Sequence, residues 1–446
     1  MIQKSRCNQI CKNYRTLSAL LWTTLCLGLT RTLGAGLEVS PSHKDGIYQH
    51  GETIVWKISA STTNISAQTN FSYRILRDNQ QVLREGLIQF KNGGAEVVTP
   101  AEHPGTLLIE IKSTAGDITN PPVLGGALVN PDKIPHSSPQ PAGFDAFWDG
   151  KLAALANVPM NPQLTAMTNN VKGISRWQVK LDLPKGQKMR GQIARPDKGV
   201  KFPAIIVFQW AGLYGLEPWS VNNHAANGWL ALNVMPHDLP IDQAPEFYKA
   251  QSAGPLKRYE MIGSEDREKS YFLRMFLACS RAVDYLASRP DWDGHNIVVT
   301  GASQGGLQSI VAAGLNPKVT AMMVVVPAGC DATASLADRG VPWPYWGQWM
   351  PADQRASALR TAPYFDGINF AARVKCPSLV GFGLLDNVAM SGGISIMTSQ
   401  LHGPVERIPM PAANHKGDHA AWNKQSQKWL EAIKVGKPVP LQTINP

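Results

Sequence analysis

The sequence predicts two domains, a small antiparallel β-sandwich followed by a larger α/β domain with a mostly parallel sheet. Length is the first observation, because 446 residues exceed what one hydrophobic core usually serves. A change of pattern is the second: short strands of alternating polarity recur up to residue 130, and continuous apolar strands separated by helical stretches follow. With 43% hydrophobic and 17% charged residues, the composition is that of a folded globular protein.

The first 35 residues have the layout of a secretory leader. Basic residues without any acidic residue flank the thirteen-residue apolar run 17–29, and small residues follow it at 34–36. A run of this length is short for crossing a bilayer. We expect residues 1–35 to be a signal peptide, with an uncleaved signal anchor as the alternative. Either form sends the protein out of the cytoplasm, into a periplasm or the extracellular medium.

The net charge of +10 does not indicate a nucleic-acid partner. Five of the basic residues belong to the leader, and cleavage after Ala35 leaves a charge of +5, which is modest for this size. Once the leader is removed we expect no stable membrane insertion. The cysteines that remain, Cys279, Cys330 and Cys376, lack metal-ligand spacing and are expected to be buried thiols. No metal and no cofactor are expected.

Residues 36–130 are expected to form the β-sandwich. Apolar and polar residues alternate in three stretches: 54–58, 71–75 and 107–111. The turn signals Asp78-Asn79 and Pro104-Gly105 lie between them. Strands that recur at this interval, with no helical stretch between them, are typical of an antiparallel sandwich.

The proline-rich residues 131–141 predict a stiff linker, and residues 142–440 the α/β domain. A helix is expected around 271–288, and strands are expected at 204–209, 297–300, 322–326 and 378–382. These strands lack polar alternation, so both of their faces should be buried. Buried strands that alternate with helices indicate a parallel sheet covered by helices on both faces.

The expected strand 297–300 runs into Gly301-Ala302-Ser303-Gln304-Gly305, and an apolar helical stretch follows. Gly-x-Ser-x-Gly at a strand-to-helix turn is the nucleophile elbow of the α/β-hydrolase fold. The glycines are needed because the serine backbone is strained there and side chains two residues away would collide. In a chain with 39 glycines the pattern alone is weak, but the flanking strand and helix strengthen it. We therefore predict that Ser303 is a catalytic nucleophile.

A serine hydroxyl becomes a good nucleophile only when a base takes its proton and an acid orients that base. The fold requires the order serine, acid, histidine. Asp386 follows an apolar strand, and His415 lies in a loop before the last helical stretch, so both are in the expected places. His419 is the rival base. Asp331 and Asp366 are the rival acids.

Acyl transfer also needs two hydrogen-bond donors for the oxyanion. The backbone amide of Gln304 is the first candidate, because it follows the nucleophile and lies at a helix N-terminus. The second donor should come from the loop after the strand 204–209. In that loop we nominate Ala211.

Several segments within residues 140–435 resemble a known family. They are Phe147-Trp148, Val158-Pro159, Arg281 to Leu286, Ser303 to Gly306, and Tyr364 to Arg373 with its continuation to Asp386. In these segments the chain resembles the acetyl xylan esterases and cephalosporin C deacetylases of carbohydrate esterase family seven. The resemblance implies hydrolysis of short acyl esters, chiefly acetyl groups, from carbohydrates. It also assigns the nucleophile to Ser303, the acid to Asp386 and the base to His415.

The chain departs from the family pattern at three places. Gln209-Trp210-Ala211-Gly212 stands where the family has a His-Gly-Tyr loop, Ala389-Met390-Ser391 replaces paired prolines, and Lys416 replaces a carboxylate. These changes bear on acyl or sugar preference rather than on the chemistry. Family members commonly form closed hexamers, which the extra β domain would obstruct, so a homo-oligomer is left open.

An insertion rich in aromatic residues is a candidate contact for the substrate. Trp343, Tyr345, Trp346 and Trp349 lie within seven residues, interleaved with two prolines. Aromatic rings can stack on sugar faces. We expect Trp343 and Trp346 to contact the substrate together with Trp210. A packed lid or a subunit contact is the alternative interpretation.

The favoured function is hydrolysis of acetylated carbohydrates through an acyl-enzyme. One alternative is another serine hydrolase on the same fold, such as a peptidase or a lipase-like esterase. A second alternative, from a different class, is a carbohydrate-binding protein without catalysis. The β-sandwich is expected to be a spacer or a binding module.

Overall fold

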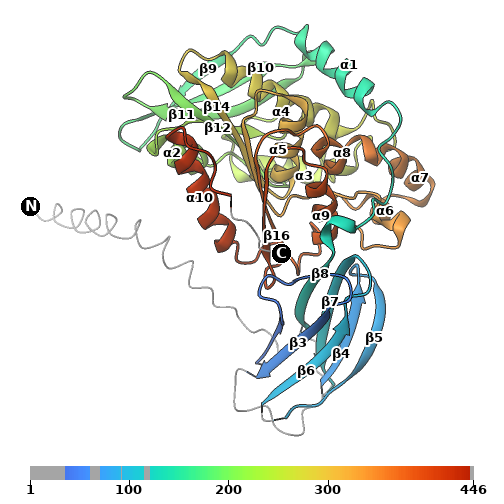
Figure 1. Cartoon of the computed structure of the whole chain (residues 1–446). Helices are drawn as coiled ribbons and strands as arrows, with labels where there is room; N and C mark the ends of the chain where they lie inside the picture. Colours follow the sequence, from blue (N-terminus) through green and yellow to red (C-terminus); the bar gives the residue numbers. More distant parts are fainter. Residues whose placement is uncertain (1–35, 61–70, 92, 115–120, 442–446) are drawn as a thin grey trace, which may run out of the picture.

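The computed structural model describes residues 36–441 apart from 61–70, 92 and 115–120 (Figure 1). The expected signal peptide, residues 1–35, lies outside the described residues. Two regions follow each other along the chain. A pair of small β-sheets comes first, and a large sheet covered by helices comes second.

Two sheets face each other in the N-terminal region. The three-stranded sheet contains β1 (Leu37–Pro41), β3 (Thr53–Ala60) and β6 (Gly94–Pro100). The five-stranded sheet runs in the order β2 (Ile47–Tyr48), β8 (Val123–Val129), β7 (Gly105–Ser113), β4 (Phe71–Arg77) and β5 (Gln81–Ile88). Neighbouring strands are antiparallel except for the pair β2 and β8. Alternate residues such as Trp56 and Ile75 fill a separate core, as the polarity pattern predicted.

One nine-stranded sheet organises the second region, in the order β17-β16-β15-β14-β12-β13-β11-β10-β9. Its strands are β9 (Gln163–Met167), β10 (Ile174–Asp182), β11 (Lys188–Pro196), β12 (Phe202–Phe208), β13 (Leu230–Met235), β14 (Trp292–Ala302), β15 (Ala321–Val325), β16 (Ser378–Gly383) and β17 (Val405–Met410). From β13 to β17 all neighbours are parallel, as predicted. The edge formed by β11, β10 and β9 is antiparallel, which was not predicted.

Helices cover both faces of this sheet. The helices of this region are α1 (Phe144–Ala156), α2 (Trp219–Ala226), α3 (Pro245–Ala253), α4 (Tyr271–Ser288), α5 (Gln304–Leu315), α6 (Trp346–Trp349), α7 (Ala352–Thr361), α8 (Gly367–Ala371), α9 (Ser391–Ser399) and α10 (Ala420–Lys434). On one face α4 and α5 pack on β14 and on each other, and α2 and α10 lie on the other face (Figure 1). Strands β13 and β16 are buried along their whole length, which is why they read as continuous apolar runs. This arrangement is the α/β-hydrolase fold.

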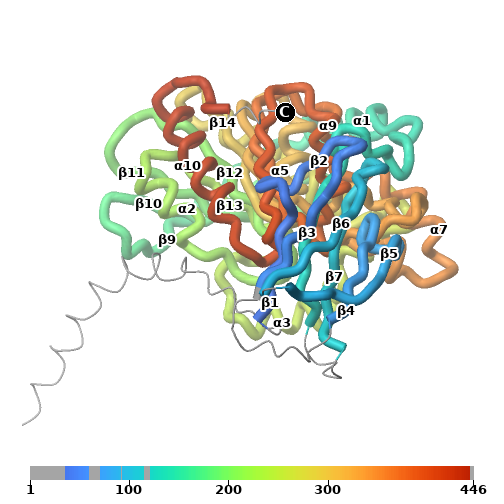
Figure 2. The backbone as a smooth tube through the Cα atoms, turned by 60° about the horizontal axis from the view of Figure 1, so that its bottom comes forward, coloured from blue at the N-terminus to red at the C-terminus, as the bar shows by residue number. Residues whose placement is uncertain are grey.

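The two regions are in direct contact, and strands of the sandwich lie beside the C-terminal part of the chain (Figure 2). Gly126 of β8 lies so close to Leu384 that a Cβ atom there would be 2.6 Å from the Leu384 carbonyl oxygen. The amide of Gly340 donates to the carbonyl oxygen of Asp78 over 2.9 Å. Because Leu384 lies two residues before Asp386, the sandwich supports the loop that carries the predicted catalytic acid.

Candidate active site

The predicted nucleophile lies at the sharp turn between β14 and α5. Ser303 has φ 56° and ψ −124°, a strained conformation for a residue with a side chain. A Cβ atom on Gly301 would lie 2.4 Å from the carbonyl carbon of Gly305, and one on Gly305 would lie 2.3 Å from the carbonyl oxygen of Phe208. Both glycines of the motif are therefore required by close backbone contacts.

Ser303, His415 and Asp386 form a continuous chain of hydrogen bonds. The Nδ1 atom of His415 lies 2.8 Å from Asp386 Oδ2, and its Nε2 atom lies 2.9 Å from Ser303 Oγ. A carboxylate accepts a hydrogen bond from Nδ1–H, which leaves the Nε2 atom of a neutral imidazole free to accept the serine proton. The three side chains come from the ends of β14, β16 and β17 at one edge of the sheet.

The Asp386 carboxylate is fixed on its second oxygen as well. Oδ1 accepts the backbone amides of Val388 and Ala389, each over 2.8 Å. The residue is 1% exposed, so these two bonds and the histidine supply the partners that a buried charge needs. The acid can therefore hold one orientation of the imidazole ring.

The rival residues lie in other surroundings. His419 is hydrogen-bonded through Nε2 to the carbonyl oxygen of Asn414, on the exposed side of the loop. Asp331 forms a buried ion pair with Arg339 at 2.7 Å. Asp366 caps α8 and accepts the amides of Asp331 and Ala332, and burial followed by the charge of Asp331 raises its pKa to about 7. None of the three rivals is hydrogen-bonded to Ser303 or His415.

Of the two nominated oxyanion donors, Gln304 directly follows Ser303, and Ala211 belongs to a loop that begins beside the turn at Ser303. Gln304 is the first residue of α5, where backbone amides have no partner within the helix. Ala211 lies in the loop after β12, and the tight fit of Gly305 against the Phe208 carbonyl brings this loop next to the elbow. Both amides are therefore candidates for an oxyanion hole.

Several hydrogen bonds hold the loop that carries Ala211. The Gln209 side chain donates to Asn233 Oδ1 over 3.1 Å. The amide of Gly212 donates to Tyr259 Oη over 3.3 Å, and His237 Nε2 donates to the Gly212 carbonyl oxygen over 3.1 Å. Neither Tyr259 nor His237 was predicted as a site residue. Neither lies in a motif, and the sequence gives no sign that they meet this loop.

The structure corrects the prediction for Trp343 and Trp346. They are 8% and 1% exposed, and the Trp346 ring stacks on Phe272 of α4 with 5.6 Å between centroids. The Trp346 indole donates to the carbonyl oxygen of Glu260 over 2.7 Å. These two rings are core residues and offer no face to a sugar. Of the three tryptophans predicted to bind substrate, only Trp210 is accessible, at 49%.

The exposed part of the aromatic insertion also packs against neighbouring side chains. The Trp349 ring, 47% exposed, lies 4.0 Å from the Tyr345 ring and 4.7 Å from the Arg258 guanidinium carbon. Burial raises the pKa of Tyr345, and the charge of Asp386 raises it further. Tyr345 therefore lies close enough to the predicted acid to sense its charge. The amide of Trp343 donates to the Val388 carbonyl oxygen over 2.9 Å, so the insertion packs against the loop that carries Asp386.

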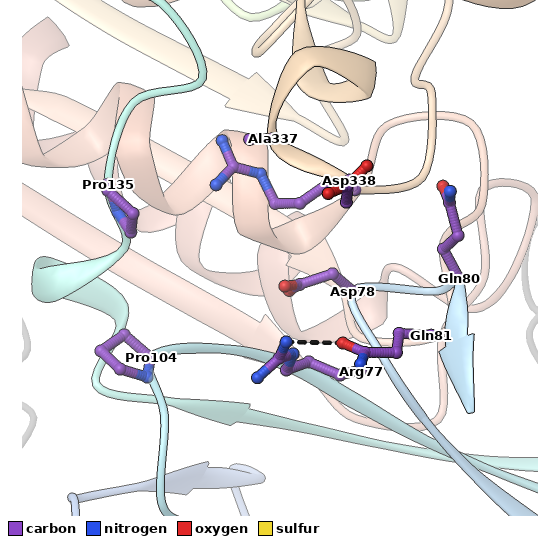
Figure 3. Close-up of a pocket in the computed structure, with 9 residues that line it drawn as sticks. Arg77, Asp78, Gln80, Gln81, Pro104, Pro135, Ala337 and Asp338 are labelled. Carbon is purple, nitrogen blue, oxygen red and sulfur yellow. Dashed lines mark hydrogen bonds between the residues drawn. The ribbon is translucent and has the colours of Figure 1, made fainter. Parts of the chain in front are cut away.

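A cavity of about 660 Å³ opens at the junction of the two regions (Figure 3). Residues of the β4–β5 turn, with Asp78 among them, line it from one side, and Asp338 and Arg339 line it from the other. Ser303, Asp386 and His415 are not among the lining residues. This cavity is thus separate from the candidate active site.

Within the part of the chain that the structure describes, no group of three or more His, Cys, Asp or Glu side chains is arranged to hold a metal ion. Among the described helices, none combines the length and apolar character needed to cross a membrane.

Fold and site together define a class, the α/β-hydrolases that act on carboxylic esters. The sequence model of the acetyl xylan esterase (AXE1) family matches residues 132–433. The chain therefore belongs to the acetyl xylan esterase family, in agreement with the resemblance in the sequence, and it is a carboxylic ester hydrolase.

Individual relatives agree with the family. The acetyl esterase Axe7A of Xylanibacter ruminicola is 27% identical over 440 residues, which cover 98% of this chain and 94% of the relative. An acetyl xylan esterase from Paenibacillus sp. R4 superposes with a TM-score of 0.58 at 24% identity, over 68% of this chain and 98% of that one. Acetyl xylan esterase 1 from Thermoanaerobacterium sp. JW/SL YS485 gives 0.55 at 18% identity, over 67% and 96%. The two structures are similar in fold.

Proposed function

We propose that this chain is an exported serine esterase that removes acetyl groups from carbohydrates such as acetylated xylan. One observation carries the proposal: Ser303 Oγ, the His415 ring and the Asp386 carboxylate are joined by hydrogen bonds of 2.9 and 2.8 Å. Such a chain can activate a hydroxyl that is otherwise a poor nucleophile. The family and its acetyl esterase relative support acetyl as the acyl group that is transferred to the serine.

In the proposed reaction, Ser303 Oγ attacks the acetyl carbonyl carbon while His415 Nε2 takes the hydroxyl proton. Asp386 stays ionised and stabilises the imidazolium through Nδ1–H. The amides of Gln304 and Ala211 donate to the oxyanion. When the carbon–oxygen bond to the sugar breaks, His415 gives the proton to the departing sugar oxygen, which leaves as a hydroxyl group. Water then attacks the acetyl-enzyme with His415 as the base, and acetate is released.

The rest of the proposal concerns substrate contact and organisation. Trp210 is half exposed and lies next to Ala211, so it is the candidate to contact the sugar. We propose a signal peptide at 1–35, the sandwich at 36–130, the linker at 131–141 and the catalytic domain at 142–440. N-terminal sequencing of the exported protein tests the first boundary: a start at Gly36 is expected, and a start at Met1 would identify a retained anchor.

The main test is a product assay on acetylated plant and algal polysaccharides and on a small aryl acetate. Wild-type protein should release acetate, and Ser303→Ala should lower kcat at least about 10⁴-fold, because the base then has no hydroxyl to activate. Both proteins should unfold at similar urea concentrations. Turnover by the Ser303→Ala protein at the wild-type rate would reject this mechanism.

The acyl preference separates the proposal from other serine hydrolases. Aryl esters of acetate, butyrate and octanoate offered to the same preparation should be cleaved with falling kcat/KM as the chain lengthens. Activity confined to long acyl chains or to peptide bonds would instead point to a lipase-like esterase or a peptidase. Glycan binding without measurable turnover in the wild type would favour a binding protein.

A further inference from the structure

We propose that Tyr259 is a positioning residue of the oxyanion hole. Its hydroxyl joins the loop that carries Ala211 to the residue that follows the nucleophile. The inference rests on the proposed function, because Ala211 and Gln304 are oxyanion donors only in that reaction. Tyr259 is the first residue of η3 (Tyr259–Met261), a 3₁₀ turn between α3 and α4, and does not itself touch the reacting atoms.

The Tyr259 hydroxyl has one partner on each side of the site. It donates to Gln304 Oε1 over 2.5 Å and accepts the backbone amide of Gly212 over 3.3 Å. An amide oxygen can only accept, so the hydroxyl proton must point to Gln304. The side-chain nitrogen of Gln304, Nε2, donates to Gln308 Oε1 over 3.3 Å, which fixes the orientation of the Gln304 side chain. One hydroxyl thus links the side chain of Gln304, whose backbone amide is the first predicted donor, to Gly212, the residue after the second predicted donor Ala211.

Gly212 is held on its carbonyl oxygen as well as on its amide. His237 Nε2 donates to this oxygen over 3.1 Å, and Tyr271 Oη donates to His237 Nδ1 over 2.7 Å. Burial, and after it the charge of Arg274, lowers the pKa of His237 to about 3, so the ring is neutral with its proton on Nε2. The Tyr259 ring packs on the edge of this imidazole with centroids 4.7 Å apart.

Tyr214 Oη supports the loop from within, by donating to the Trp210 carbonyl oxygen over 2.8 Å, and the bonds to Gly212 come from outside the loop. Ala211 has no side chain that could anchor it, and Gly212, at φ 124°, has a backbone freedom that other residues lack. The Gln209 bond to Asn233 fixes the start of the loop, and the two bonds to Gly212 fix its end. The Ala211 amide lies between these two anchors. An oxyanion donor is effective only when it is aimed before the charge develops.

A simpler explanation for these bonds is that they only provide the buried Tyr259 hydroxyl with hydrogen-bond partners. Tyr259 is 5% exposed, and a buried hydroxyl needs partners wherever it lies. Tyr248 provides the comparison within the same part of the chain. It is 3% exposed, and its hydroxyl donates to the Pro240 carbonyl oxygen over 2.7 Å and accepts the Gln243 amide over 3.2 Å. Its bonding matches that of Tyr259, but its hydrogen bonds go to Pro240 and Gln243 and not to Gly212 or Gln304.

The experiment compares Tyr259→Phe with Tyr248→Phe on an aryl acetate. Each variant loses one hydroxyl with one donated and one accepted hydrogen bond, so similar drops in urea stability are expected. Tyr259→Phe should lower kcat about 10-fold with KM within about 2-fold, because a misaligned donor weakens transition-state binding more than substrate binding. Tyr248→Phe should keep both constants within about 2-fold of wild type.

A thionoester supplies a readout that a structural role would not move. Sulfur in place of the carbonyl oxygen accepts hydrogen bonds poorly, so a well-aimed oxyanion hole favours the oxygen ester. The ratio of kcat/KM between aryl acetate and aryl thionoacetate should fall about 10-fold in Tyr259→Phe and should not change in Tyr248→Phe. In a double-mutant cycle, Tyr259→Phe combined with Gln304→Met should lose no more than the worse single variant.

Equal kcat losses in the two tyrosine variants would overturn the inference, as would an unchanged thionoester ratio in Tyr259→Phe. Additive losses in the cycle would also count against it. These results differ from a failure of the proposed function. In that case wild-type protein itself would not hydrolyse aryl acetate, or Ser303→Ala would retain its activity.

Discussion

The predicted nucleophile and the predicted acid are held in place in different ways. The turn at Ser303 is formed by its neighbours in the sequence, because β14 ends and α5 begins around it and Gly301 and Gly305 allow the turn, and it packs against Phe208 and Val325 of the adjacent strands. Asp386 is positioned by distant segments. Gly126 of the sandwich lies against Leu384, and the amide of Trp343 donates to the Val388 carbonyl oxygen over 2.9 Å.

The side of the site with Ser303 is thus formed mainly by a local motif, whereas the side with Asp386 depends on the whole fold. The aromatic insertion connects the two sides. Through Trp343 it reaches the acid loop, and through Trp346 it reaches Glu260, next to Tyr259. Substitutions on each side should therefore have different signatures, and the sandwich should affect catalysis although it contributes no residue to the triad.

The largest expected effect is on the local side. Gly305→Ala adds a methyl group 2.3 Å from the Phe208 carbonyl oxygen, where only backbone could yield. Both the serine and the oxyanion loop should shift, so kcat on an aryl acetate should fall about 10³-fold. Gly150→Ala in α1 is the matched control, since its added Cβ meets nothing within 4 Å. A Gly305→Ala protein with a tenth of wild-type activity would show that the elbow is not locally constrained.

The second effect concerns the insertion that joins the two sides. Trp346→Ala removes a fully buried ring stacked on Phe272, so the free energy of unfolding should fall by about 4 kcal/mol. The Michaelis constants for an oligosaccharide acetate and for a small aryl acetate should change equally, because the ring has no face for a sugar. Trp349→Ala, at an exposed position, should cost about 1 kcal/mol or less. A selective rise in the constant for the oligosaccharide would restore the stacking hypothesis.

The contrast also explains what the sequence could predict. The position of Ser303 at a strand-to-helix turn was predictable because strand, glycines and helix lie within one short segment. That Asp386 and His415 lie near it was predictable from their order and from the strands they follow, since parallel strands end at one edge. Tyr259 was not, because it meets a residue 45 positions later and belongs to no motif. Periodicity could not place Trp346 in the core, because its burial depends on contact with α4.

The antiparallel edge of the sheet was missed for another reason. In β10 the residues Trp177, Val179 and Leu181 alternate with polar ones, and the turn at Pro184–Gly186 leads into β11. The signal for a hairpin was therefore present in the sequence. The later parallel strands lack this alternation, because they are buried on both faces, and the prediction for the sheet was based on them.

The third prediction tests the long-range side. Gly126→Val puts a side chain 2.6 Å from the Leu384 carbonyl oxygen, so the loop with Asp386 must move or the two regions must separate. A shift of the acid should lower kcat about 30-fold while KM changes little. Gly94→Val in β6 is the control in the same region, where the nearest atom to the added Cβ is at 3.6 Å. Wild-type kcat in Gly126→Val would show that the sandwich is only a spacer.

The smallest expected effect is a change in stability with pH, because His237, which bonds to the loop that carries Ala211, is buried and neutral. The pKa of His237 is about 3 in the folded protein, and an unfolded histidine has a pKa of about 6.5. Below pH 6.5 the unfolded chain takes up a proton that the folded protein does not. The free energy of unfolding should therefore fall as the pH is lowered below about 6.5, by about 1.4 kcal/mol per pH unit at most.

Urea unfolding of wild type and His237→Gln at pH 7.0 and 5.5 measures this contribution. Glutamine can still donate to the Gly212 carbonyl oxygen but does not titrate, so the variant should lose about 1 kcal/mol less than wild type over this range. Asp366, with a pKa raised to about 7, acts with the opposite sign, but it is present in both proteins and cancels in the difference. Burial raises the pKa values of Tyr259 and Tyr271 above their usual range, so neither titrates here. The same pH dependence in both proteins would mean that His237 takes up a proton in the folded state, and a proton on Nδ1 would then break the bond from Tyr271 that orients the ring.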